Sequence, residues 1–340
     1  MDKVRTADLP AVPQARPAQA SAPVTEPDAP GYDGDSAAGL GAAAEAAKAK
    51  PVSLSPAERQ QVATKKATCP FIGSAVAMGA LGVRNSADKP LASIDDVVAL
   101  GNSGGGDLGE VLKLFATGNH AKMADGSGKL GAPVPNGLFS LDFPGSQGSH
   151  PGHSGILEGD PAQVDSGRFD QQNFDRLLSH AKNGYLKRSD LAAFMAENLA
   201  RDPNAKVLAP HVGGLLLADT GRAIAQAFPA IAGKLRGNGD DQARKLAEAT
   251  TKTLGEDNLI GTSGEFGLLM AFLAHSPNTK TIDGEPAISV ADLTAMFKEH
   301  RLPDGWQNWP KYKKDWVENT TVLLAEAGKD YVKARKNSKA

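Results

Sequence analysis

Cys69, the single cysteine of the chain, is the first residue whose type and position suggest a chemical role. Pro70 follows it, and a proline suits the first position of a helix because its missing N–H group costs nothing there. A thiol at that position faces unpaired backbone N–H groups and the positive end of the helix dipole, so we expect its pKa to be lowered. A thiolate held in this way is a strong ligand for haem iron. The alternative is a small buried apolar side chain without chemistry.

Carboxylates and a histidine form two further candidate sites. His153 stands five residues before Glu158, which begins the triplet Glu158-Gly159-Asp160. Taken without further context, Glu158 and Asp160 indicate a solvated acidic turn. Glu265 leads an otherwise apolar segment, so we expect partial desolvation and a raised pKa that suits proton transfer. The alternative is an acid that only offsets the dipole at a helix start.

Taken in order, these segments resemble the haem–thiolate peroxidase family, which includes the chloroperoxidases and unspecific peroxygenases. The resemblance covers roughly residues 60–310 and depends on four motifs in the same order. They are the Cys-Pro pair at 69–70, the run from His153 to Asp160, the phenylalanine-bearing segment at 169–175, and Met296-Phe297-Lys298-Glu299-His300-Arg301-Leu302-Pro303-Asp304.

The resemblance implies a haem site with defined roles. Cys69, next to Pro70, would be the fifth ligand of the iron. Glu265 would move a proton between the two oxygens of a bound peroxide. Family members also carry a cationic partner for this glutamate, but Gly159 and Asn258 stand at its two positions here. The candidates that remain are His153, His150 and His275.

The resemblance also implies a divalent cation, such as magnesium, beside a haem propionate. Glu158 and Gly159 match the family's first ligands. The family's serine ligand falls near Ala162, which has no side-chain oxygen. Asp160 or Asp165 would then supply the missing oxygen, because a hard cation accepts any oxygen donor.

The pattern of apolar residues predicts an all-α fold, in which a single multi-helix domain encloses the haem pocket. Residues 1–52 are rich in Pro and Ala and predict a disordered arm, whereas residues 53–335 form the helical domain. Within it we expect helices that begin at Ser55 and Ser93, and others at 169–178, 189–199, 265–274, 289–300 and 315–332. Short strands are expected at most.

The charge and composition of the chain argue against nucleic-acid-binding and membrane-spanning proteins. The net charge of −2 gives no electrostatic footprint for nucleic acid, and no apolar run approaches the length of a membrane span. We expect no nucleic-acid partner and no membrane span. The absence of a secretory signal and the single cysteine favour a cytoplasmic location. The oligomeric state stays open.

Three weaker signals in the sequence suggest other functions. The glycines at 104–109 match a dinucleotide fingerprint, but a helix, not a strand, is expected before them. Asn183-Gly184 and Asp283-Gly284 resemble the turns of degenerate EF-hands. The tryptophans at 306, 309 and 316, with neighbouring lysines, indicate a helix that packs on the core, or else a binding surface.

The sequence therefore predicts a haem-dependent peroxidase or peroxygenase. It would use hydrogen peroxide to oxidise or oxygenate a small organic substrate. The alternative function is a helical, non-enzymatic binding or scaffold protein with EF-hand-like joints.

Overall fold

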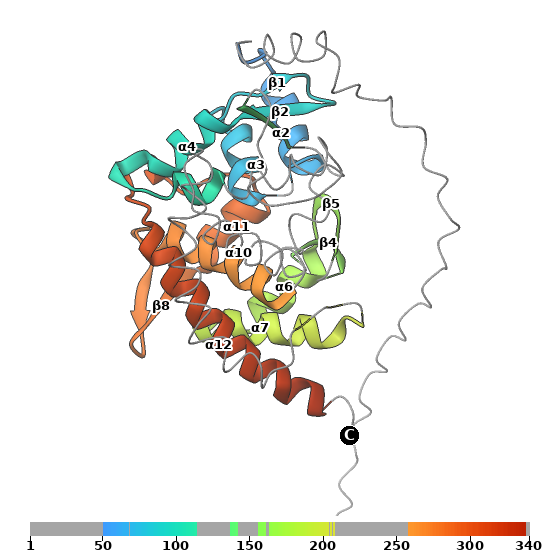
Figure 1. Cartoon of the computed structure of the whole chain (residues 1–340), viewed down its shortest axis with the longest axis vertical. Coiled ribbons are helices and arrows are strands. Elements are labelled where there is room, and N and C mark those ends of the chain that lie inside the picture. The colour runs from blue at the N-terminus through green and yellow to red at the C-terminus, as the bar shows by residue number, and fades with distance from the viewer. Residues whose placement is uncertain are drawn as a thin grey trace, which may run out of the picture.

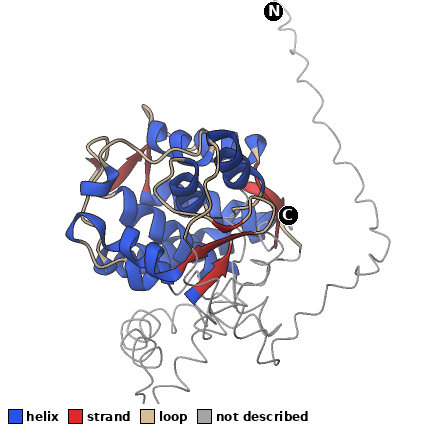
Figure 2. Cartoon of the chain, turned by 90° about the horizontal axis from the view of Figure 1, so that it is seen from above, coloured by secondary structure: helices blue, strands red, loops and turns tan. Residues whose placement is uncertain are grey.

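The computed structural model describes residues 50–67, 69–113, 137–141, 156–160, 163–203, 205, 207 and 258–337. Helices dominate this part of the chain, and short strands lie at its edges (Figures 1 and 2). The expectation of a domain rich in helix with only short strands is confirmed for these residues. The predicted arm falls almost entirely outside them, as do the glycine- and histidine-rich residues 142–155.

The longer described helices are α2 (Pro56–Lys65), α3 (Pro70–Ala77), α4 (Ile94–Asn102), α6 (Gln171–Ser179), α7 (Arg188–Arg201), α10 (Asn258–Leu273), α11 (Val290–Phe297) and α12 (Lys313–Asn337). Two short 3-10 helices, η1 (Ser103–Gly105) and η3 (Trp306–Asn308), lie next to each other.

Local signals set the starts of several helices. Ser55 caps α2, because its hydroxyl accepts a hydrogen bond from the N–H of Glu58 while the Glu58 carboxylate accepts one from the N–H of Ser55. Ser93 caps α4 in a similar way. The helix before the Gly104–Gly109 run is therefore present as expected, which argues against a dinucleotide fingerprint.

The strands form three small antiparallel sheets among the described residues. Their bounds are β1 (Arg84–Asn85), β2 (Pro90–Ser93), β3 (Leu138–Ser140), β4 (Leu157–Asp160), β5 (Gln163–Phe169), β6 (Tyr185–Lys187), β7 (Lys280–Ile282) and β8 (Glu285–Ser289). The sheets have the orders β1-β2-β3, β4-β5 and β6-β8-β7.

The segment around Phe169 differs from the expectation of a helix over 169–178. Phe169 ends β5, where it pairs with Leu157, and α6 begins two residues later. Asp170 caps that helix, since its Oδ1 accepts a hydrogen bond from the N–H of Asn173 at 2.9 Å. Two residues separate the end of the partner strand β4 from the start of β5, and a pattern of helical periodicity does not detect such a strand pair.

The two EF-hand-like turns lie in the same sheet. Strand β6 precedes α7, β8 precedes α11, and Leu186 pairs with Ile288 between them. Asp283 and Gly284 have positive φ angles of 54° and 80°, and they make the tight turn between β7 and β8. The pairing of β6 with β8 therefore links the two EF-hand-like turns.

Helix α10 lies near the middle of the molecule, between α3 and α11 on one side and α7 and α12 on the other (Figure 1). Its contact with α12 is close because Gly267 has no side chain, and a Cβ there would overlap Thr320 Oγ1. Trp316 Nε1 also donates a hydrogen bond to the carbonyl of Gly264 at 2.9 Å. Gly264 and Gly267, which interrupt the apolar pattern of the sequence, therefore allow α10 and α12 to pack closely.

The described chain begins close to the core. Val52, at the end of the predicted arm, donates a backbone hydrogen bond to the carbonyl of Val83 at 2.8 Å. Across the described ranges, none of the helices combines the length and the apolar character that crossing a membrane requires.

Candidate active site

Cys69 is the N-cap residue of α3, and Pro70 occupies the first helical position, as the sequence predicts. The residue as a whole is half-buried and packs against the apolar core. Burial raises the pKa of the Cys69 thiol to about 11. The free thiol is therefore protonated near neutral pH.

The expectation of a lowered thiol pKa at the helix start is wrong. The backbone N–H groups of Ile72 and Phe71 do act to lower the pKa, but neither makes a capping hydrogen bond to the sulfur. Desolvation of a charged sulfur outweighs their effect because water is excluded from this part of the helix. A proton must leave this sulfur before it can bind a metal.

The aromatic ring of Phe71, two residues after Cys69, connects α3 to two other segments. It packs edge to face against Phe272 of α10, with ring centroids 4.9 Å apart. It also meets the ring of Trp306 in η3 at 5.9 Å and 89°. These contacts fix the helix start that carries the thiol against α10.

Glu265 lies in the middle of α10, not at its start as expected, and is buried. It precedes Phe272 by seven residues, which is two helical turns, so both side chains leave the same face of the helix. The opposite face, with Gly264 and Gly267, packs on α12. Glu265 is thus turned toward the side of α10 that meets α3.

The Glu265 carboxylate has a minor electrostatic effect on Cys69. Its negative charge adds to the rise in the pKa of the thiol, but burial is the main cause of that rise and the carboxylate is the last of the effects in size. The two groups come from distant segments of the sequence, and they lie within electrostatic range of each other.

The other predicted site residues are described less fully. Glu158, Gly159 and Asp160 lie in β4, where Gly159 pairs with Val164 and Asp160 with Gln163. The described residues do not include the side chains of this strand or any part of His153. Over the described ranges, no group of three or more His, Cys, Asp or Glu side chains is placed to hold a metal ion.

The structure describes one proposed partner of Glu265, His275, and one of the two positions without a cation, Asn258. His275 contacts Asp315 of α12, with Nε2 3.4 Å from Oδ2, and its ring meets Tyr312. Asn258 is buried and lies two turns before Glu265, on the same face of α10. Its side chain offers an amide and no charge.

Lys311 is a feature that the sequence analysis placed in a basic aromatic patch. It is fully buried, and its ammonium donates to the carbonyls of Ser103, Trp306 and Trp309 and to the hydroxyl of Ser103, at 2.7–3.1 Å. Trp306, Trp309 and Trp316 are buried too. This region is therefore part of the core, which is the first of the two interpretations that the sequence left open. Gly104 and Gly106 allow the backbone of Trp309 and Lys311 to approach closely.

The described residues also line an open depression of about 470 Å³. Its walls come from the end of α3, from α4 and from η3; the lining residues are Ala80, Gly82, Asp96, Ala99, Leu100, Ser103, Trp306 and Gln307. Neither Cys69 nor Glu265 lines it, so it is separate from the thiol–carboxylate pair.

Comparison of the chain with protein-family models, with curated proteins and with solved structures finds no match. The function must therefore be argued from the site itself.

Proposed function

We propose that this protein is a haem–thiolate peroxidase or peroxygenase that uses hydrogen peroxide to oxidise or oxygenate a small organic molecule. The observation that carries the proposal is that the Cys69 thiol at a helix start and the buried Glu265 carboxylate lie on two helices joined by the Phe71–Phe272 contact, within electrostatic range of each other. One is a soft donor for iron, and the other is a buried acid–base group.

The residues present fit a haem group in three respects. Cys69 supplies the sulfur donor at a helix start, where the N–H groups of Phe71 and Ile72 would favour its thiolate once the proton has left. Phe71 and Phe272 supply apolar surface beside it. Glu265 supplies a proton-transfer group within electrostatic range of the sulfur. When bound, the haem would supply the redox chemistry of peroxide.

The chain's own residues have distinct tasks in this proposal. Cys69 would lose its proton and hold the haem iron as a thiolate, which is a strongly electron-donating ligand. Glu265 would take a proton from one peroxide oxygen and return it to the other, so that water could leave. The packing of α10 against α12 and of Phe272 against Phe71 holds the carboxylate in place relative to the sulfur.

The proposed divalent cation beside the haem is a separate question. Glu158 and Asp160 would be its ligands, with the carbonyl of Gly159 between them. Their backbone forms β4, in which Asp160 pairs with Gln163. Titration of the purified protein with magnesium, followed by its melting temperature, tests this part of the proposal alone.

The decisive experiment is a haem titration followed by absorption spectroscopy. We expect one haem per chain and a ferrous carbonyl spectrum typical of a thiolate ligand. Cys69→His should keep haem but give the spectrum of a nitrogen ligand, and Cys69→Ala should lose the sulfur ligand. A preparation that binds no haem under these conditions overturns the proposal.

The alternative is a non-enzymatic scaffold, favoured by the β-pairing of the two EF-hand-like joints. These turns are poorly suited to calcium, because the Lys187 ammonium already pairs with the carboxylates: it lies 3.3 Å from Asp283 and 3.8 Å from Glu285. A fold with calcium-linked joints would bind calcium and no haem. A calcium titration in parallel with the haem titration separates the two functions.

A further inference from the structure

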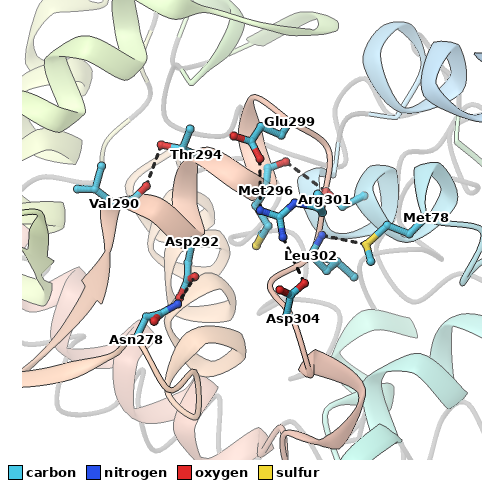
Figure 3. A network of polar contacts seen from close by, with 11 residues as sticks. Met78, Asn278, Val290, Asp292, Thr294, Met296, Glu299, Arg301, Leu302 and Asp304 are labelled. Atoms are coloured by element: carbon cyan, nitrogen blue, oxygen red, sulfur yellow. Dashed lines mark hydrogen bonds and ion pairs between the residues drawn. The ribbon is translucent and has the colours of Figure 1, made fainter.

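Met78 stands out because its side chain is both exposed and hydrogen-bonded through sulfur. It follows the last residue of α3, and it is 41% exposed, whereas Met195, Met270 and Met296 are buried. Its Sδ accepts a hydrogen bond from the backbone N–H of Leu302 at 3.1 Å (Figure 3). A thioether is a weak acceptor, but it is also the part of methionine that peroxides attack.

This contact joins α3 to the turn after α11. Leu302 is fully buried, and the described residues give its N–H no acceptor other than Met78. The hydroxyl of Ser74 makes the second link, since it donates to the carbonyl of Met296 at 3.2 Å. Among the described residues, these two hydrogen bonds tie α3 to α11 and to the turn that follows it.

Further hydrogen bonds and ion pairs of Arg301, the residue before Leu302, hold the turn in place. The N–H of Arg301 donates to the carbonyl of Ala295 at 2.8 Å, and the exposed Arg301 side chain reaches Glu299 and Asp304 (Figure 3). His300 has a positive φ of 50°, which non-glycine residues seldom adopt. Such a turn is held by its contacts and should respond when one of them is lost.

We propose that Met78 is a peroxide-sensitive modification site, and that its oxidation to the sulfoxide loosens the junction between α3 and the turn at Leu302. Sulfur attacks one oxygen of hydrogen peroxide, an S–O bond forms, and the O–O bond breaks. The departing oxygen takes the protons and leaves as water, so sulfur loses two electrons and the peroxide gains them. Free hydrogen peroxide is the oxidant, so this inference does not depend on haem.

The new oxygen changes the geometry of the contact. It becomes the stronger acceptor, but it lies one bond beyond the sulfur that now faces the Leu302 N–H. Oxygen added on the lone pair that faces Leu302 would displace the turn, because Leu302 is enclosed in the core. Oxygen added on the other lone pair withdraws electrons from the sulfur and makes it a poorer acceptor. The turn must therefore move or lose this hydrogen bond.

The test treats the full chain with dilute hydrogen peroxide and follows two readouts. Peptide mass spectrometry should find a gain of one oxygen at Met78 at least about tenfold faster than at Met270 and Met296, as their burial requires. Trypsin should then cut after Arg301 about 2- to 10-fold faster, the factor that corresponds to one net hydrogen bond. Methionine sulfoxide reductases should reverse both changes.

Met78→Leu is the matched variant, since it keeps the apolar volume and removes the sulfur. Its cleavage after Arg301 should start faster than in the wild type and should not respond to peroxide. Full oxidation of Met78 with unchanged cleavage after Arg301 would overturn the proposal. So would oxidation of the buried methionines before Met78.

Discussion

Phe71 and Phe272 pack edge to face with ring centroids 4.9 Å apart, and this contact positions the candidate site. Phe71 follows Cys69 by two residues at the start of α3, and Phe272 follows Glu265 by two turns on one face of α10. The pair therefore joins the helix start that carries the thiol to the helix face that carries the carboxylate. Predictions about the site begin with this contact.

Phe272→Ala should destabilise the fold and also impair the site. We expect the free energy of unfolding to fall by about 3–5 kcal/mol, as measured by chemical denaturation, because a buried ring is lost. The folded variant should also bind haem more weakly. Phe194→Ala is the control, since Phe194 packs on Phe266, on the α7 side of α10. It should cost similar stability and leave haem affinity unchanged; equal haem affinity in both variants would contradict this role for Phe272.

Glu265→Gln should lower the pKa of the Cys69 thiol in the haem-free protein. The carboxylate disfavours the thiolate by its charge, and an amide does not. The pH profile of alkylation by iodoacetamide measures this pKa directly, because the chain has one cysteine. Glu299→Gln is the control, since Glu299 is exposed and pairs with Arg301. A thiol pKa that stays at about 11 in Glu265→Gln would show that the two groups do not interact.

The same Glu265→Gln variant should keep haem and lose most peroxide turnover. The expected decrease is on the order of 10²–10⁴ in rate, which is typical of a missing general acid–base group. Glu299→Gln should retain full turnover. Activity that survives in Glu265→Gln would move the acid–base role to another residue, with Glu158 and His153 the first to test.

Gly267→Ala and Gly328→Ala should change stability in opposite directions. At Gly267 a Cβ would overlap Thr320 Oγ1 and lie 2.9 Å from the Thr320 backbone nitrogen, so we expect a loss of about 1–3 kcal/mol. At Gly328, in α12, a Cβ would meet only Leu259 at an ordinary 3.8 Å. Alanine there should stabilise the protein by about 0.5–1 kcal/mol through helix propensity. Thermal denaturation of both variants checks the pair, and a stabilising Gly267→Ala would contradict the close α10–α12 contact.

Lys311 should make stability rise with pH above about 8. Burial lowers the pKa of its ammonium to about 8 in the folded chain, from an ordinary value of 10.5. Between these values the unfolded chain holds a proton that the folded chain has lost, so the free energy of unfolding increases with pH. The full gain is on the order of 2–3 kcal/mol.

Urea denaturation from pH 7 to pH 10.5 measures this gain as the difference between the wild type and Lys311→Met. Cys69 contributes in the opposite direction, because its raised pKa makes stability fall as pH rises through about 11. Both proteins contain Cys69, so its contribution cancels in the difference between them. Lys298→Met, at an exposed position, should keep the wild-type slope. A wild-type slope in Lys311→Met would exclude Lys311 as the source.

Local signals in the sequence were sufficient for much of the secondary structure. The Ser55 capping box, the Ser93 cap and Pro70 after Cys69 place the starts of α2, α4 and α3, because each depends on hydrogen bonds or sterics within one turn. Cys69 and Glu265 could also be chosen as candidate site residues from the sequence alone, by their residue types and their order along the chain.

Only the tertiary structure decided what surrounds those residues. The thiol pKa rises because distant segments exclude water from Cys69, an effect that outweighs the local N–H groups of its helix. Glu265 lies in mid-helix because Gly264 and Gly267, which interrupt the sequence pattern, allow α12 to pack closely on α10. Lys311 is buried because carbonyls from two short helices surround its ammonium. Solvation and close packing depend on chain segments far apart in sequence, and the local sequence does not encode them.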